Sequence, residues 1–275
     1  MDLKTLQDTP PWEWPPETEQ FLLDLLGDHT ADAADRKAAA ELAGDYSVIS
    51  DALALGLLTV VRDERESSDL RSTAVIALGP ALEHADMMGF EDEDDVLISE
   101  RLFHTLQDTL QKLYMQADLP KELRQRILEA SVRAPQKWHH EVVRSAYGSN
   151  DPAWRLTAVF CMGYIGGFDS QIIEALQNPD PLVHYHAVCA AGNWEVDEAW
   201  PHISELVRSD RTDKDLRIAA IGAVAAIRPE EAGGLFNDLI ESEDEELVEA
   251  VFEALALAGG LEEFDDDDED DDEDD

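Results

Sequence analysis

The chain has 275 residues, and 63 acidic residues against 20 lysines and arginines give it a formal net charge of −43. A field of that sign repels phosphate backbones and anionic lipids, so we expect no direct binding of nucleic acid or of a membrane surface. The hydrophobic fraction of 44% is large enough to form a buried core, which excludes a wholly disordered chain.

Residues 1–16 form a segment rich in proline and tryptophan that lacks the basic and apolar stretches of a signal peptide. We therefore expect a soluble cytoplasmic protein, and its two cysteines are too few for a disulfide framework. Trp12 and Trp14 lie in this segment. They either cover the exposed end of the region that follows, which is the interpretation we favour, or form an exposed hook for a partner.

Residues 17–261 contain an internal repeat. The segments 151–163 and 180–192 both begin with Asp-Pro, end in glycine, and carry an arginine or histidine at the fifth position. Related segments recur along the chain, and the anchors, which are the positions that correspond to Arg155 and His184, are separated by 35, 53, 31, 29, 33 and 31 residues. The anchors are Arg36, Arg71, Arg124, Arg155, His184, Arg217 and Val248. A period of this length indicates stacked supersecondary units.

Each copy has the features of a helix. An aspartate before proline supplies an N-cap oxygen and a residue already set for the first helical turn. Apolar and small residues then recur three and four apart, and Gly or Ala eight positions after the anchor permits close helix approach or ends the helix. A further apolar-periodic stretch lies between copies. The sequence therefore predicts an all-α fold, a right-handed α-solenoid (superhelix) of about seven helix pairs.

The wide interval between Arg71 and Arg124 marks an insertion. An acidic insert near residues 86–95 contains five consecutive acids, and an apolar-periodic stretch over 96–117 follows it. We expect an extended helix over 96–117, with the insert forming either a projecting loop or a kink in the superhelix.

The pattern Asp-x-x-Val/Leu-Arg-x-x-Ala-x-x-Ala-Leu-Gly resembles HEAT repeats, especially the short HEAT-like class named after phycobilisome lyases. The resemblance extends over roughly residues 17–260 and is best in 69–79 and 151–227. It implies that the second helix of each pair lines a concave face and that each anchor arginine pairs with a nearby aspartate of the inter-helix turn. It also implies a binding surface more readily than an enzyme.

No catalytic, cofactor-binding or metal-ligating set is predicted. Only the dipeptide 140–141 has the His-Glu form through which HEAT-like hydroxylases bind two irons. His184 and His186 are two apart on a helix and point to different faces, which makes a poor chelate. The two cysteines are flanked by apolar residues, so we interpret them as small buried thiols.

Residues 262–275 comprise thirteen acids and Phe264, and we expect this acidic tail to be disordered. We interpret the protein as a non-enzymatic interaction scaffold or adaptor that binds a basic protein surface through its concave face and acidic tail. The candidate partner-binding residues are Leu156, Tyr185, Ile218 and Phe264.

Two other functions stay open. A bilin-lyase-like enzyme or lyase-assisting factor needs an apolar pocket on the concave side. An acidic chaperone or nucleic-acid mimic for a DNA-binding protein needs acids spaced along one surface. The acidity is equally expected of an adaptation to a salt-rich cytoplasm, and the sequence names neither the partner nor the oligomeric state.

Overall fold

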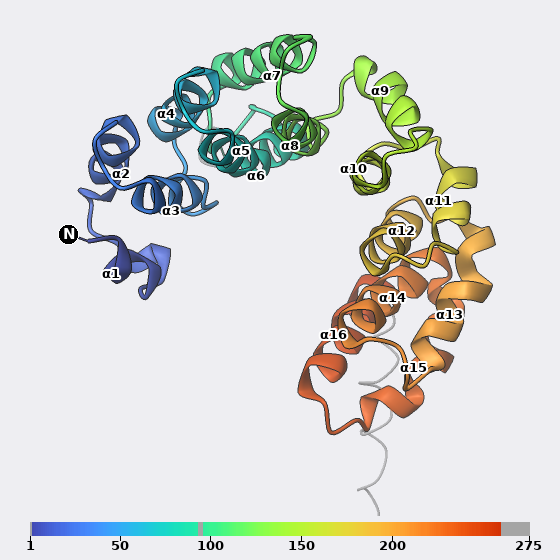
Figure 1. Ribbon diagram of the computed structural model, residues 1–275. Coiled ribbons are helices and arrows are strands. Elements are labelled where there is room, and N and C mark those ends of the chain that lie inside the picture. Colours follow the sequence, from blue (N-terminus) through green and yellow to red (C-terminus); the bar gives the residue numbers. More distant parts are fainter. Residues whose placement is uncertain (1, 93–95, 260–275) are drawn as a thin grey trace, which may run out of the picture. The chain divides into compact units, whose positions relative to one another are not determined.

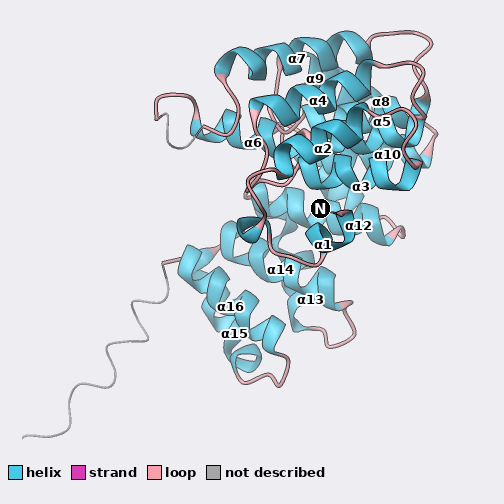
Figure 2. Cartoon of the chain, turned by 90° about the vertical axis from the view of Figure 1, so that its left-hand side faces the viewer, coloured by secondary structure: helices cyan, strands magenta, loops and turns pink. Residues whose placement is uncertain are grey.

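The computed structural model describes residues 2–92 and 96–259. Within these ranges the chain consists of helices joined by loops and turns, without a strand (Figure 1, Figure 2). The chain divides into two compact units, Met1–Val142 and Val143–Asp275. Their boundary falls inside helix α9 (Lys137–Tyr147). The acidic tail with Phe264 and residues 93–95 of the acidic insert lie outside the described residues.

Unit 1 is built from pairs of helices that pack in two layers. The helices that precede α9 are α1 (Leu3–Gln7), η1 (Pro11–Glu13), α2 (Thr18–Gly27), α3 (Ala33–Ala43), α4 (Asp51–Arg62), α5 (Ser68–Ala77), α6 (Gly79–Met88), α7 (Glu100–Tyr114) and α8 (Lys121–Ser131). The first helices α2, α4 and α7 pack on one another in succession, and so do the second helices α3, α5 and α8 (Figure 1).

The helix starts in unit 1 follow from short polar side chains at the N-cap. The carboxylate of Asp32 accepts a hydrogen bond from the Ala34 N–H at 2.8 Å. The hydroxyl of Ser67 accepts one from the Leu70 N–H at 3.1 Å. Each bond satisfies a backbone donor that has no partner within the helix, so these residues determine where α3 and α5 begin.

The core of unit 1 lies between the two layers. Leu53 and Leu57 lie four apart on α4, and Leu106 and Leu110 lie four apart on α7; all four are fully buried. Because neither layer can cover these leucines alone, each helix pair is stabilised by its neighbours.

The N-terminal segment is folded against unit 1. Its residues 3–7 form α1, which packs on α3. The indole N–H of Trp14 donates to the carbonyl oxygens of Leu6 (3.1 Å) and Thr9 (2.8 Å), and its ring packs against the core. Trp12 is 78% exposed. Trp14 therefore covers the end of the unit, while Trp12 remains on the surface.

The wide interval between Arg71 and Arg124 contains an additional helix, α6, which packs on α5, α7 and α8. The helix expected over 96–117 is present as α7, Glu100–Tyr114, and is shorter at both ends. It begins late because the Ser99 hydroxyl caps it, accepting from the Leu102 N–H.

Unit 2 repeats the same plan. Its helices after α9 are α10 (Pro152–Met162), α11 (Asp169–Ala175), α12 (Pro181–Asn193), η2 (Asp197–Ala199), α13 (Trp200–Arg208), α14 (Lys214–Ile227), α15 (Pro229–Ile240) and α16 (Glu245–Leu257). The second helices α10, α12, α14 and α16 pack in succession, and α11, α13 and α15 cover one side of them (Figure 1). Fully buried side chains such as Ile172, Ile203 and Phe236 fill the space between the layers.

The seven anchors fall on the second helices α3, α5, α8, α10, α12, α14 and α16. The predicted all-α solenoid of helix pairs is thereby confirmed. No helix among the described residues is long and apolar enough to cross a membrane.

Two of the glycines eight positions after an anchor, Gly44 and Gly192, mark a close contact between second helices. A Cβ added at Gly44 would lie 2.6 Å from Cβ and 2.7 Å from Cα of Ala77. A Cβ added at Gly192 would lie 2.9 Å from Cα of Ala223. Both alanines occupy the sixth position after the anchor of the following copy, so the same pair of positions forms the contact in both units.

We predict that Gly44→Ala destabilises unit 1 by about 1–3 kcal/mol, because the new methyl group meets backbone atoms of α5 that cannot rotate away. Chemical denaturation monitored by circular dichroism measures the change. The control is Gly27→Ala, where nothing lies within 4 Å of the added Cβ. Equal stability of the two variants would show that α3 and α5 can separate without cost.

Candidate functional site

The candidate site is an apolar groove between the first turns of α12 and α14 in unit 2. Its volume is about 390 Å³. The residues that line it are Pro181, Leu182 and Tyr185 of α12 and Asp213, Asp215, Leu216 and Ile218 at the start of α14. Leu182 is 57% exposed, which is high for a leucine in an ordered helix. The groove thus combines an apolar lining with two carboxylates.

The N-caps of the two helices position this groove. The carboxylate of Asp180 accepts hydrogen bonds from the N–H groups of Leu182 (2.9 Å) and Val183 (3.3 Å). One carboxylate oxygen of Asp213 accepts from the Asp215 N–H (3.1 Å) and the Leu216 N–H (3.4 Å). Because α12 and α14 pack together, capping at equivalent places brings their first turns side by side.

The side chain of Tyr185 is held from within α12. Its hydroxyl is hydrogen-bonded to the thiol of Cys189, and the neighbouring Cys189, burial and Asp215 together raise the pKa of Tyr185. Burial also raises the pKa of the Cys189 thiol. The phenol and the thiol are therefore both neutral near pH 7, and Tyr185 offers the groove an uncharged ring.

The structure brings two of the four candidate partner-binding residues together, since Tyr185 and Ile218 line the same groove. Leu156 lies on α10, is half-buried, and is not among the lining residues. Phe264 lies outside the described residues. The sequence reasoning missed Leu182 and the two aspartates. The Asp-Pro-Leu start of α12 was the available signal, because the third residue of a capped helix start is often exposed.

The anchor arginines have a structural role. The Nε–H groups of Arg71 and Arg217 donate to the carbonyl oxygens of Val61 and Val207, each at 2.9 Å. These acceptors lie in the last turns of α4 and α13, the helices that precede the anchors. The arginines thus satisfy C-terminal carbonyls and place positive charge at the negative end of a helix dipole.

The pairing with turn aspartates is expected of every anchor arginine, and the structure corrects this in part. Arg217 does lie 3.2 Å from Asp210 of the inter-helix turn. The carboxylate partner of Arg36 is Glu66 from the next repeat, however, and not Asp32 four positions before it. The guanidinium of Arg155 stacks 5.8 Å from the ring centre of Tyr147. The physical reason is the length of the side chain. The guanidinium group of an arginine on a packed helix contacts the end of a neighbouring helix more easily than a carboxylate in its own first turn.

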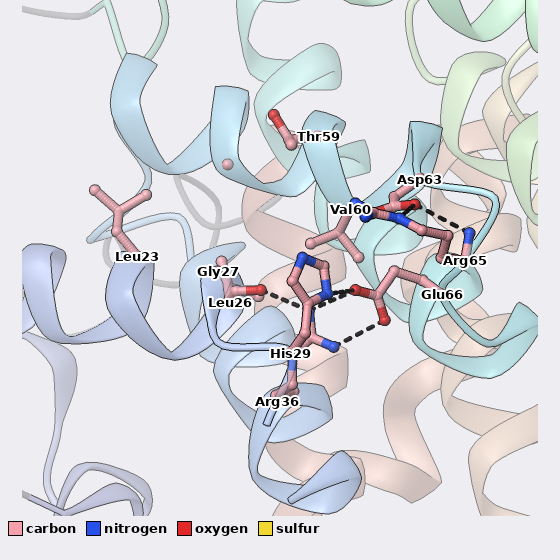
Figure 3. Close-up of a pocket in the computed structure, with 11 residues that line it drawn as sticks. Leu23, Leu26, Gly27, His29, Arg36, Thr59, Val60, Asp63, Arg65 and Glu66 are labelled. Carbon is pink, nitrogen blue, oxygen red and sulfur yellow. Dashed lines mark hydrogen bonds and ion pairs between the residues drawn. The ribbon is translucent and has the colours of Figure 1, made fainter. Parts of the chain in front are cut away.

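A second cavity of about 220 Å³ lies in unit 1 (Figure 3). Arg36 donates to both carboxylate oxygens of Glu66, each at 2.8 Å, and to the Leu26 carbonyl oxygen at 2.6 Å. The ring of His29 lies 2.7 Å from Glu66, and Arg65 binds Asp63. The His29, Asp63 and Glu66 side chains come close enough to hold a cation together. Two guanidinium groups already neutralise these carboxylates, so the cluster is built as an inter-repeat ion-pair network.

His184 stands at the one anchor that is a histidine. Its Nε2 lies 2.8 Å from Nε2 of His202 on α13, so one neutral ring donates to the other. Burial lowers the pKa of both, and for His184 the neighbouring His202 lowers it further. His186 instead meets the ring of Phe160. This agrees with the expectation that positions 184 and 186 face different ways.

The comparisons with known proteins support the repeat assignment. Residues 170–256 match the family model described as HEAT repeats. The match does not distinguish the phycobilisome-lyase type. HEAT repeats commonly serve as protein-interaction scaffolds. No curated protein matches this sequence.

Several solved structures are similar. One is the Escherichia coli protein YibA, with 14% identity over 90% of this chain and 99% of that chain and a TM-score of 0.47. Human deoxyhypusine hydroxylase in complex with glycerol shows 15% identity over 94% of this chain and 88% of that chain, with a TM-score of 0.39. An engineered protein shows 18% identity over 89% of this chain and 97% of that chain, with a TM-score of 0.34.

The Arg36–Glu66 pair gives a prediction with a defined pH dependence. Hydrogen bonds from Arg36 hold the pKa of Glu66 below its ordinary value of 4.5. Its stabilising contribution is therefore complete above that value and is lost as the pH falls through the lowered pKa. Glu66→Gln lowers the free energy of unfolding by about 1–3 kcal/mol at pH 7, and the difference from the unmodified protein narrows as the pH falls below 4.5.

Urea unfolding of both proteins across this pH range measures the effect. The control is Glu64→Gln in the same turn, where the side chain is exposed and a change within about 0.5 kcal/mol is expected. A loss of stability that stays constant with pH would contradict an ion-pair origin.

Proposed function

We propose that this protein is a non-enzymatic scaffold that binds a basic protein surface. The groove between α12 and α14 carries the proposal. It exposes apolar side chains, Leu182 above all, beside the carboxylates of Asp213 and Asp215. A surface of that composition fits a partner that presents apolar and cationic groups together.

The charge of the chain supports the same function. With a formal net charge of −43, the protein attracts cationic surfaces before contact and speeds their encounter. The acidic tail, residues 262–275, adds thirteen of these charges. The screening length at physiological salt is about 8 Å, so the tail acts mainly at encounter and at short range.

The bilin-lyase alternative has less support. The groove is apolar as that function requires, but a bilin carries propionate groups, and the two aspartates at the groove repel carboxylates. The half-buried Cys189 thiol next to the groove also offers no ready nucleophile, because its raised pKa keeps it protonated near pH 7.

The nucleic-acid mimic is supported by one specific observation. The N-cap aspartates of α10, α12, α14 and α16 recur once per repeat in unit 2. They form a row of carboxylates at successive helix starts, as a mimic of a phosphate backbone requires. This function predicts that the protein displaces DNA from its partner, which the scaffold function does not require.

We predict that the immobilised full chain retains proteins of positive net charge from a lysate of its own cell, and that about 1 M salt releases them, because the screening length then falls to about 3 Å. Removal of residues 262–275 weakens retention. Leu182→Ser weakens it further because the apolar contact is lost. Quantitative mass spectrometry of the retained proteins measures each change.

The matched control is Leu55→Ser on α4, since Leu55 is 53% exposed and lies outside the groove. Retention that is insensitive to salt, or equal for the Leu182 and Leu55 variants, would contradict the proposal.

A further inference from the structure

The chain itself shows how a lysine binds to the start of a repeat helix. Lys214 is the first residue of α14, directly after the N-cap Asp213. Its Nζ lies 2.8 Å from Oδ1 of Asp244, the N-cap of α16, and 2.7 Å from Oε2 of Glu246. The ammonium group thus bridges the N-cap carboxylate of the next second helix and the carboxylate two positions later.

A similar contact occurs in unit 1. The ammonium group of Lys37 on α3 binds the carboxylate of Asp69 at 3.0 and 3.1 Å. Asp69 again lies two positions after an N-cap, Ser67 of α5. In two places, therefore, a lysine of one second helix binds a carboxylate in the first turn of the next, from one position after the anchor in α3 and from three positions before it in α14.

One repeat before Lys214, the carboxylates are present and the lysine is missing. Asp213 is the N-cap of α14, and Asp215 lies two positions after it, as Asp244 and Glu246 do for α16. The position that corresponds to Lys214 is the first residue of α12, which is Pro181. Among the described residues, neither Asp213 nor Asp215 makes an ion pair.

This carboxylate pair lies in the apolar groove. Both aspartates line it together with Leu182, Tyr185 and Ile218. One oxygen of Asp213 accepts the capping hydrogen bonds, and its second oxygen remains for a ligand. The groove therefore has carboxylates at the two positions that bind Lys214 one repeat later, beside apolar side chains such as the exposed Leu182.

We propose that Asp213 and Asp215 receive a lysine or arginine side chain of a partner polypeptide, and that an apolar residue next to it in that partner packs on Leu182, Tyr185 and Ile218. The cation takes the place that Lys214 occupies one repeat later. The proposal rests on the proposed scaffold function and states which chemical group of the partner is recognised.

The decisive variant is Pro181→Lys, which supplies the missing lysine from the chain itself. Proline at the first helical position is replaceable, since its missing N–H is one of those that lack a helical partner in any case. The matched control is Pro152→Lys at the same position of α10, because it adds the same charge after the same Asp-Pro start. A lysine at position 152 would be next to the first turn of α12. That turn has Asp180 at its N-cap, but Leu182 stands where a second carboxylate would be needed.

The probe is the blocked peptide Gly-Leu-Lys-Leu-Gly, titrated into the full chain and followed by NMR. We expect shifts at the first turns of α12 and α14. Pro181→Lys should weaken binding by about tenfold or more, while Pro152→Lys leaves it within about twofold. The double variant Asp213→Asn with Asp215→Asn should also weaken peptide binding by about tenfold or more, and the asparagine at position 213 still caps α14. A peptide with norleucine in place of lysine should bind more weakly.

A measurement without any ligand separates this inference from the scaffold function. In Pro181→Lys, the protons of the new side-chain ammonium should exchange slowly with water and give an NMR signal, as we expect of Lys214. Adding Asp213→Asn and Asp215→Asn to this variant should abolish that signal. An unprotected ammonium, equal peptide affinities for the two lysine variants, or shifts away from α12 and α14 would overturn the inference. Failure to retain basic proteins in the lysate experiment would instead overturn the scaffold function while leaving the ammonium result intact.

Discussion

A single helix pair of this chain cannot cover its own apolar face, and the rest of the structure depends on this constraint. Each pair must be covered by the next, so the second helices approach until small residues touch, as Gly44 does with Ala77 and Gly192 with Ala223. Interhelical distances of about 8–10 Å leave little freedom to slide. Within each unit, equivalent positions of neighbouring repeats are therefore held in register.

Because the repeats are held in register, a residue that differs between two repeats changes the contacts that are made at one defined place. Because α12, α14 and α16 begin at equivalent places, a residue at a helix start faces the same two positions of the next helix each time. Lys214 meets two carboxylates and binds them. Pro181 faces Asp213 and Asp215 and cannot bind them, which leaves a groove where the repeat is broken. In a fold made of similar units, such departures are where a specific site can arise.

The same packing explains part of the negative surface. The anchor arginines Arg36 and Arg71 are buried, at 5% and 6% exposure, and bind carbonyl groups or an inter-repeat carboxylate. Their charge is used inside the structure and does not offset acids on the surface. These two guanidinium groups are therefore not available to a partner at the surface.

The sequence by itself determined the repeated helix pairs and the position of the anchors, because N-caps, apolar spacing and a period near 31 residues are local properties. The helices α1 and α6, which lie outside these pairs, were found only in the structure. It also singled out Tyr185 and Ile218, which follow directly after two anchors.

Only the tertiary structure decided what those residues meet. It brought Tyr185 and Ile218 into one groove with Leu182, and it gave Arg36 a partner thirty residues away in Glu66. Such contacts depend on the distance between neighbouring helices and on the direction of long side chains, and a local pattern in the sequence contains neither.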